Sequence, residues 1–163
     1  MVLMINVIQA TGGNEQLVLG FIRSMETGDL PEVVKAECTK EFVWANSGLA
    51  TINGQAELFD QMARGGFAAQ IPILKTMTHF SADLIHVASK GDIVFTERVD
   101  HHWDEQGRDL MTPHICGVAE IREGRISAFR DFYDIACYNQ APTEVQRGYD
   151  LASFREAQLN GTK

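Results

Sequence analysis

The second half of the chain contains four strand-like segments that are separated by short turn sequences. The segments are rich in β-branched and aromatic residues and lie at about 73–88, 92–103, 109–122 and 125–135. Turn-forming residues occur between them, at 89–92, 104–107 and 123–124. Three consecutive hairpin signals of this kind predict an antiparallel meander.

The first half of the chain favours helices. A first helix is expected to begin at Asn14, a suitable capping residue, and to end at Gly28. Its apolar residues recur at helical spacing, at Leu17, Val18, Phe21, Ile22 and Met25. Asp29 is expected to cap a second helix that has Pro31 in its first turn. The remaining elements are a strand and two helices, expected at about 41–46, 54–69 and 143–158.

Helices followed by a run of strands predict an α+β fold. We expect the N-terminal helices to pack on a strongly curved mixed, mainly antiparallel sheet that forms a cone with a deep pocket. No repeat, linker or low-complexity segment divides the chain, so residues 1–163 are expected to form a single domain. A domain of 163 residues is large enough to enclose a ligand-sized cavity.

The net charge of −8 limits the partners that the chain is expected to bind. Nucleic acids and anionic membrane surfaces attract basic patches, and the sequence contains no dense basic cluster. No apolar run approaches the ~20 residues of a membrane span. The three cysteines form no CxxC pair, so neither a disulfide framework nor a metal site is indicated. We therefore expect a cytoplasmic protein that binds neither membranes nor nucleic acids.

Two of the strand-like segments carry acidic residues that sheet formation does not explain. Arg98 and Asp100 are two positions apart, so their side chains are expected to point to the same face of a strand. Phe129, Asp131 and Tyr133 share one face of the last segment. Aspartate is depleted in strands, which favours a functional reason for both carboxylates. The alternative is an Arg–Asp ladder on a solvated sheet face, which would contribute little to stability.

The aromatic neighbours of Asp131 favour a buried site over a solvated ladder. Two carboxylates that share one guanidinium in an apolar pocket cannot both lose their protons cheaply. The expected state is one proton shared by Asp100 and Asp131 beside Arg98, which provides an acid and a base at the same pH. This combination suits the addition of water to an epoxide, a reaction that requires neither a metal nor a cofactor.

Several motifs make the chain similar to a known family. The longest are Val-Phe-Thr-Glu-Arg-Val-Asp at 94–100, Cys-Gly-Val at 116–118 and Glu-Gly-Arg-Ile-Ser-Ala-Phe-Arg-Asp-Phe-Tyr-Asp at 123–134. Two more are Phe-Ile-Arg-Ser-Met-Glu-Thr-Gly-Asp at 21–29 and Trp-Ala-Asn at 44–46. Through these motifs the chain resembles the limonene-1,2-epoxide hydrolases over about residues 14–138. That family has the cystatin-like cone fold, which nuclear transport factor 2 and ketosteroid isomerase share.

The resemblance implies a role for each candidate residue. Asp131 matches the general base that activates water, and Asn46 matches an amide that helps to hold this water. Arg98 matches the residue that bridges the two carboxylates, and Asp100 matches the general acid that protonates the epoxide oxygen. The positions that match the lining of the family's pocket are Ile22, Met25, Phe129 and Tyr133.

Two further residues expected at the pocket depart from the family's pattern. Trp44 stands where the family has a tyrosine whose hydroxyl helps to hold the water. An indole N–H donates but cannot accept, so Trp44 either holds the water through its oxygen or fills the pocket mouth. His102 falls where an apolar residue is expected, and it shares the strand face of Asp100, whereas His101 faces the opposite way.

The resemblance implies that water opens a small hydrophobic epoxide without a cofactor. It also implies a homodimer formed through the outer face of the sheet, where Phe132 and Val99 are the candidate contact residues. Two other functions remain open. One is an isomerase or cyclase of the ketosteroid-isomerase or SnoaL-like type, which removes a proton from carbon. The other is a non-catalytic module that binds a small molecule without turnover.

Overall fold

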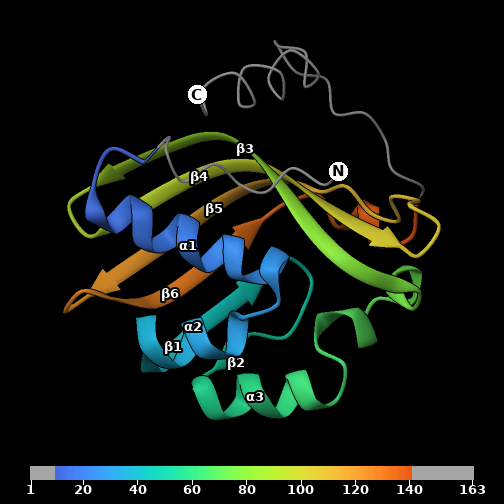
Figure 1. The fold of residues 1–163 in the computed structure, drawn as a ribbon, viewed down its shortest axis with the longest axis horizontal. Coiled ribbons are helices and arrows are strands. Elements are labelled where there is room, and N and C mark those ends of the chain that lie inside the picture. Colours follow the sequence, from blue (N-terminus) through green and yellow to red (C-terminus); the bar gives the residue numbers. More distant parts are fainter. Residues whose placement is uncertain (1–9, 141–163) are drawn as a thin grey trace.

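The structure, a computed structural model, describes residues 10–140 as a curved sheet with helices packed against it (Figure 1). The helices are α1 (Gly13–Thr27), α2 (Leu30–Glu37) and α3 (Gln55–Ala63), and short 3₁₀ turns are η2 (Phe67–Ala69), η3 (Pro72–Leu74) and η4 (Ile135–Tyr138). The strands are β1 (Cys38–Asn46), β2 (Ile52–Asn53), β3 (Met77–Lys90), β4 (Ile93–Asp104), β5 (His114–Arg122) and β6 (Arg125–Phe132). This order of elements confirms the α+β prediction.

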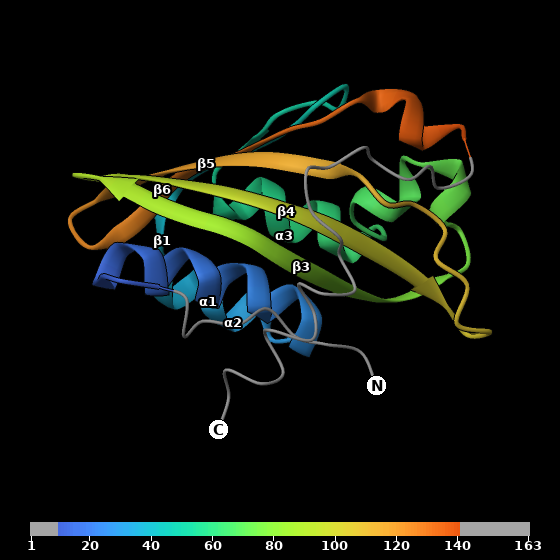
Figure 2. The same cartoon turned by 90° about the horizontal axis from the view of Figure 1, so that it is seen from above.

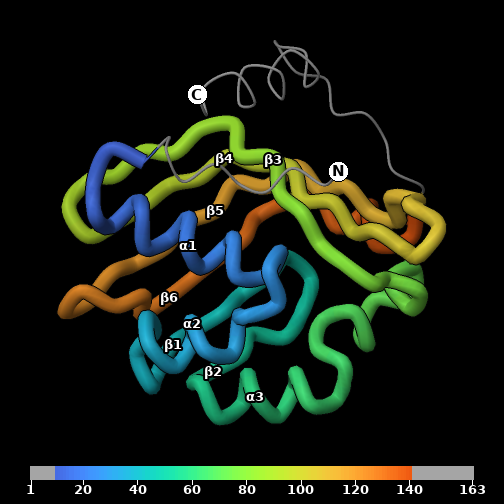
Figure 3. Tube along the Cα trace, in the orientation of Figure 1, coloured from blue at the N-terminus to red at the C-terminus, as the bar shows by residue number. Residues whose placement is uncertain are grey.

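The six strands form an open mixed sheet in the order β2-β1-β6-β5-β4-β3. All neighbouring pairs are antiparallel except β1 and β6, which run parallel. Figure 3 shows these two strands side by side although they are the first and the last strand along the chain. Irregular register in the long β3–β4 ribbon helps the sheet to bend, and its curvature is visible in Figure 2.

Helix α1 runs beside β3, the edge strand of the sheet (Figure 1). Two carboxylates of α1 satisfy polar groups of this strand: Glu26 accepts a hydrogen bond from the backbone N–H of Ala82, and Glu15 accepts one from Ser89 Oγ, both at 2.8 Å. The apolar side of α1 packs into the main core with β1 and β6. Fully buried members of this core are Val18, Phe21, Ile22, Phe42 and Ile126. Burial of these side chains supplies the main driving force that holds helix and sheet together.

Two helix boundaries differ from the sequence prediction. The third helix, predicted over 54–69, ends at Ala63, because Gly65 adopts a φ of +97° that breaks the helical path. The first helix begins before Asn14, and Gly12 is its N-cap residue. Asn14 is therefore wrong as the predicted cap, and its side chain points instead to the turn between β3 and β4.

All four strands of the predicted meander are present, but two of them begin later than expected. β3 begins at Met77 rather than near residue 73, because Pro72–Leu74 form the turn η3. β5 begins at His114, and the segment before it contacts β4 through an isolated bridge and scattered backbone hydrogen bonds rather than a continuous strand pairing. The three predicted turns do connect consecutive strands.

Other predictions concern the surface and the end of the chain. Among residues 10–140, no helix is long and apolar enough to cross a membrane. The helix predicted at 143–158 lies outside the described residues.

Of the two candidate contact residues for a dimer, Phe132 is 53% exposed. Val99 is only 1% exposed, so its prediction as a surface residue is wrong.

Candidate active site

A row of paired residues crosses four strands in the middle of the sheet. Asn46 at the end of β1 pairs with Asp131 in β6. Asp131 pairs in turn with Gly117 in β5, and Gly117 pairs with Thr96 in β4. Residues in register on neighbouring strands face the same way, so this row places an amide, a carboxylate and a hydroxyl on one face. The glycine leaves a gap between the carboxylate and the hydroxyl.

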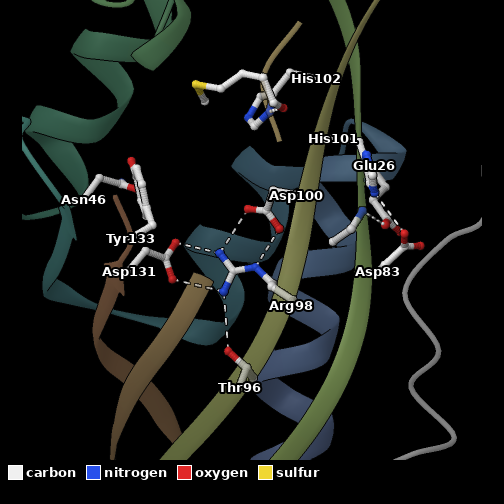
Figure 4. A network of polar contacts seen from close by, with 12 residues as sticks. Glu26, Asn46, Asp83, Thr96, Arg98, Asp100, His101, His102, Asp131 and Tyr133 are labelled. Atoms are coloured by element: carbon white, nitrogen blue, oxygen red, sulfur yellow. Dashed lines mark hydrogen bonds and ion pairs between the residues drawn. The ribbon is translucent and has the colours of Figure 1, made fainter. Parts of the chain in front are cut away.

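Arg98 fills this gap and connects the two predicted catalytic carboxylates (Figure 4). Its Nε and Nη2 donate to Asp100 at 2.8 and 3.2 Å, and its Nη1 and Nη2 donate to Asp131 at 3.0 and 2.7 Å. Nη1 also donates to Thr96 Oγ1 at 3.4 Å. Arg98 is 0% exposed and each carboxylate only 5%. The structure therefore brings the predicted Asp–Arg–Asp group together and separates it from bulk solvent.

Burial controls the protonation of this group. It raises the pKa of both Asp100 and Asp131 above the usual range of a carboxyl group, although the charge of Arg98 opposes the shift. Burial also disfavours the charge of Arg98, but the two carboxylates outweigh it and raise the pKa of the guanidinium. The guanidinium therefore stays charged, and any proton that the group gains resides on a carboxyl group.

Gly117 provides the space that Arg98 needs to reach across β5. A Cβ atom at this position would lie 2.5 Å from Thr96 Oγ1, 2.9 Å from Arg98 Nη1 and 3.1 Å from Asp131 Oδ1. These distances are too short for any side chain to fit without displacing the hydrogen bonds of the site. The glycine is therefore required by close approach, and its backbone needs no unusual φ value.

A chain of hydroxyl groups contacts Asn46 at the other end of the row. Tyr133 Oη lies 3.3 Å from Asn46 Oδ1 and 2.6 Å from Tyr138 Oη. Tyr138 donates its own proton to the backbone carbonyl of Ser47. Since a hydroxyl has one proton, the hydrogen bond between the two tyrosines is donated by Tyr133. Burial raises the pKa of Tyr133, and the contact with Tyr138 raises it further, so this hydroxyl remains protonated.

The Asp–Arg–Asp group forms one wall of a cavity of about 440 Å³. This volume lies within the range of roughly 300–1,000 Å³ that is typical of small-molecule sites. Most of the remaining wall is apolar and includes Leu30, Leu49, Leu58, Ile71, Met77 and Phe80. The cavity can therefore pack against an apolar ligand and present the two carboxyl groups to it.

The structure separates the predicted pocket residues into two sets. Met25, Trp44, His102 and Tyr133 line the cavity. Ile22 and Phe129 do not, and they lie in the main core instead. Phe129 was predicted to line the pocket, and it lies on the same strand face as Asp131. That face extends from the cavity into the core, and Phe129 lies on the core part. Its ring supports the site from the core, because the guanidinium carbon of Arg98 lies 5.5 Å from the ring centroid.

Trp44 belongs to an aromatic cluster in the cavity wall. Its ring lies 5.1 to 6.2 Å, between centroids, from the rings of Phe21, Phe42, Phe67 and Phe129. Its Nε1 is enclosed and has no hydrogen-bond partner among residues 10–140. The enclosed N–H does not support the expected role of holding a water molecule, and the ring packs in the cavity wall rather than at a position shown to be the pocket mouth. The hydroxyl group at this end of the cavity belongs to Tyr133.

The adjacent histidines point to opposite faces of β4, as their spacing predicts. His102 lines the cavity, and its Nδ1 lies 2.7 Å from the carbonyl oxygen of Met111. His101 lies on the other face, where its Nε2 is 2.9 Å from Asp83 and its Nδ1 is 2.5 Å from Asp109. Within residues 10–140, no three His, Cys, Asp or Glu side chains are grouped so that they could hold a metal ion.

Three residues of the site were not among those predicted from the sequence. Thr96 precedes Arg98 by two positions, so the same strand alternation could have placed it on the cavity face. Gly117 lies within a motif quoted for the family resemblance, but its steric role requires knowledge of the neighbouring strands. Nothing in the local pattern identifies Tyr138, because its contact with Tyr133 depends on the turn η4.

The fold is an open, curved sheet with helices packed against it, and the site is a buried acid–guanidinium–acid group at an apolar cavity. Together they define a class of cone-fold proteins equipped for acid–base chemistry. A model of the limonene-1,2-epoxide hydrolase catalytic domain matches residues 12–141 of this chain. The chain belongs to that family, as its motifs predict.

Solved structures show the same fold in proteins of several kinds. An epoxide hydrolase of M. tuberculosis described as LEH-like is 23% identical, with a TM-score of 0.61 over 77% of this chain and 86% of that one. A SnoaL-like polyketide cyclase from Jannaschia sp. CCS1 is 12% identical, with a TM-score of 0.60 over 80% and 94%. An NTF2-like protein of unknown function from Cytophaga hutchinsonii is 16% identical, with a TM-score of 0.53 over 82% and 95%. At these identities the similarity establishes the cone fold and leaves the reaction to be argued from the site.

Proposed function

We propose that this chain hydrolyses a small, mostly apolar epoxide to a vicinal diol by direct attack of water. The observation that carries the proposal is the fully buried guanidinium of Arg98, held between Asp100 and Asp131 in the wall of an apolar cavity. Membership of the limonene-1,2-epoxide hydrolase family supports the same reaction class.

The proposed reaction needs one proton on the carboxyl pair. Asp131, as the carboxylate, removes a proton from water while the water oxygen forms a bond to one ring carbon. The bond between that carbon and the epoxide oxygen breaks, and protonated Asp100 gives its proton to this oxygen. The charge of Arg98 stabilises whichever carboxyl group is ionised throughout the reaction. Proton exchange with water then restores the starting state of both groups.

Asn46 suits the role of holding the water because it lies beside Asp131 in the register of β1 and β6. Tyr133 uses its proton in the bond to Tyr138, so it can only accept from Asn46. Two hydroxyl protons cannot serve all three contacts, so we assign the amide with its NH₂ group, rather than Oδ1, toward Tyr133 and with its oxygen toward the cavity. The two hydrogens of the water then point to Asn46 and Asp131, which leaves an oxygen lone pair free to attack the epoxide.

The decisive test is diol formation in isotopically labelled water with a panel of cyclic and terpene epoxides. We expect the wild type to yield diols that carry one labelled oxygen. Asp131→Asn should reduce kcat by about 10²–10⁴-fold, because the variant lacks the general base. Asp60→Asn is the matched control, since Asp60 is an exposed carboxylate on α3 and its loss should leave kcat unchanged.

The same experiment distinguishes hydrolysis from the other activities of cone-fold proteins. An isomerase would incorporate solvent deuterium at a carbon atom of a ketone substrate and would leave the labelled oxygen in the water. A binding module would retain the epoxide unchanged. If the folded wild type yields no diol from any epoxide in the panel, the proposed function is wrong.

A further inference from the structure

His102 is a polar group in the cavity wall that the proposed proton transfers do not use. It follows Asp100 by two positions on the cavity face of β4, and Figure 4 shows both side chains on this strand. The residue is 9% exposed, and its ring packs edge-on against Phe80 with 5.5 Å between the ring centroids. A polar ring has therefore been accommodated where the surrounding wall is mainly apolar.

The contact with Met111 fixes which nitrogen of the ring carries hydrogen. Nδ1 lies 2.7 Å from the carbonyl oxygen of Met111, and a carbonyl oxygen can only accept, so Nδ1 is the protonated nitrogen. The backbone supports this arrangement, because the carbonyl of His102 accepts a hydrogen bond from the N–H of Leu110 at 2.8 Å. Burial lowers the pKa of His102 to about 4, so the ring is neutral near pH 7 and Nε2 has a lone pair without hydrogen.

Nε2 has no hydrogen-bond partner among residues 10–140, and its residue belongs to the cavity wall. Within those residues, the enclosed side-chain nitrogen and oxygen atoms that lack a partner are Thr39 Oγ1 and Trp44 Nε1. His102 lines the cavity, and Nε2 is not one of these enclosed atoms. The cavity wall thus includes a hydrogen-bond acceptor, close to the acid–base group, that no residue among 10–140 uses.

We propose that Nε2 of His102 accepts a hydrogen bond from a hydroxyl group of the substrate. The preferred substrate is then an epoxide that carries a hydroxyl group at a distance from the ring, rather than a pure hydrocarbon epoxide. The two strand positions separate Asp100 and His102 by about 7 Å along β4, which places the hydroxyl several bonds from the epoxide oxygen. This inference rests on the proposed function and assigns a substrate class to it.

The test uses cyclohexene oxides that differ in one ring substituent: hydroxymethyl, ethyl or methoxymethyl. Hydroxymethyl and ethyl are close in size, and the methoxymethyl group retains the oxygen but cannot donate a hydrogen bond. We expect the wild type to prefer the hydroxymethyl compound by about 10- to 100-fold in kcat/KM, mainly through KM, because the other two leave Nε2 unpaired.

Two variants of His102 separate recognition of the substrate from support of the fold. His102→Leu removes both nitrogens. His102→Asn retains an N–H group that can donate to Met111 but has no atom at the position of Nε2. Both variants should lose the preference for the hydroxymethyl compound, so that the ratio of its kcat/KM to that of the ethyl compound falls to about one. If His102→Leu does not fold, His102→Asn and the wild-type comparison still decide the question.

Several results would overturn the inference. One is a wild type that hydrolyses the ethyl and hydroxymethyl compounds equally well. Another is an equal loss of activity toward both compounds in the two variants, which would indicate a role in the reaction itself. If no epoxide is turned over, calorimetric binding of hydroxymethylcyclohexane and ethylcyclohexane tests the acceptor without catalysis. Equal affinities would refute it, whereas a preference for the alcohol that His102→Asn abolishes would support it.

Discussion

Two faces of the same strand carry the same arrangement of charges with different consequences. On the cavity face of β4, Arg98 lies between Asp100 and Asp131. On the opposite face, His101 lies between Asp83 and Asp109. Figure 4 shows Arg98 with Asp100 and Asp131 on one side of the strand, and His101 and Asp83 on the other. In both groups a buried or nearly buried cationic side chain contacts two carboxylates.

The difference lies in which member of each group holds the mobile proton. Arg98 cannot release its proton, so a proton that enters the cavity group must reside on Asp100 or Asp131, whose pKa values are raised by burial. In the other group, burial works against the charge of His101, but hydrogen bonds to its two carboxylates outweigh it and raise its pKa to about 9. The permanent cation therefore creates a reactive carboxylic acid, whereas the titratable cation takes the proton itself.

The largest effect is expected from removing the permanent cation. Arg98→Met would leave two carboxylates buried without a partner, which should lower the free energy of unfolding in urea by about 3–5 kcal/mol at pH 7. Arg130→Met is the matched control, because Arg130 pairs with Glu120 at a partly exposed site and should change the free energy by no more than about 1 kcal/mol. Equal effects of the two substitutions would contradict the burial argument.

The titratable cation should make stability depend on pH. The pKa of His101 is about 9 in the folded chain and ~6.5 in an unfolded one. Its stabilisation is therefore complete below about pH 6.5 and is lost as the pH rises through about 9. The shift corresponds to about 3 kcal/mol in the free energy of unfolding. His101→Gln should remove this decline in urea titrations between these pH values, and parallel curves for wild type and variant would refute the prediction.

A substitution at Gly117 should disturb the group formed by Arg98 and its two carboxylates. It should leave the His101 group on the opposite face of β4 unchanged. Gly117→Ala would force a methyl group against Thr96 Oγ1 and Arg98 Nη1, so it should destabilise the fold by about 1–3 kcal/mol and reduce kcat. Gly20→Ala is the control, because a Cβ at this helical position meets no atom within 4 Å. This control should be neutral or stabilise the chain by up to about 1 kcal/mol. The pH dependence assigned to His101 should persist in both variants.

The smallest expected effect is electrostatic coupling between the two groups. The charge of His101 lowers the pKa of Asp100, although burial dominates the net shift. His101→Gln should therefore raise the pKa of Asp100, the proposed general acid, and move the alkaline limb of the pH–activity profile to higher pH. The shift should be less than about one pH unit, because the groups lie on opposite faces of the strand. A shift to lower pH would contradict this coupling.

Strand alternation predicted much of the site from the sequence. It placed Arg98 and Asp100 on one face and separated His102 from His101, and the structure shows both arrangements. The same reasoning failed for Phe129, because alternation identifies a face of the sheet but not where the cavity ends and the core begins. Strand alternation also could not predict that the indole nitrogen of Trp44 is enclosed. This enclosure depends on aromatic rings from α1, β1, η2 and β6.

The sequence by itself determined the hairpins of the sheet, the apolar side of α1 and the presence of two strand carboxylates near a guanidinium. These features depend on turn residues and on periods of two or 3.6 residues, which are local properties of the chain. Only the tertiary structure decided the parallel pairing of β1 with β6, which brings Asn46 beside Asp131, and the close approach across Gly117. It also decided that burial would raise the pKa values of the two carboxyl groups, because burial is a property of the assembled sheet and helices.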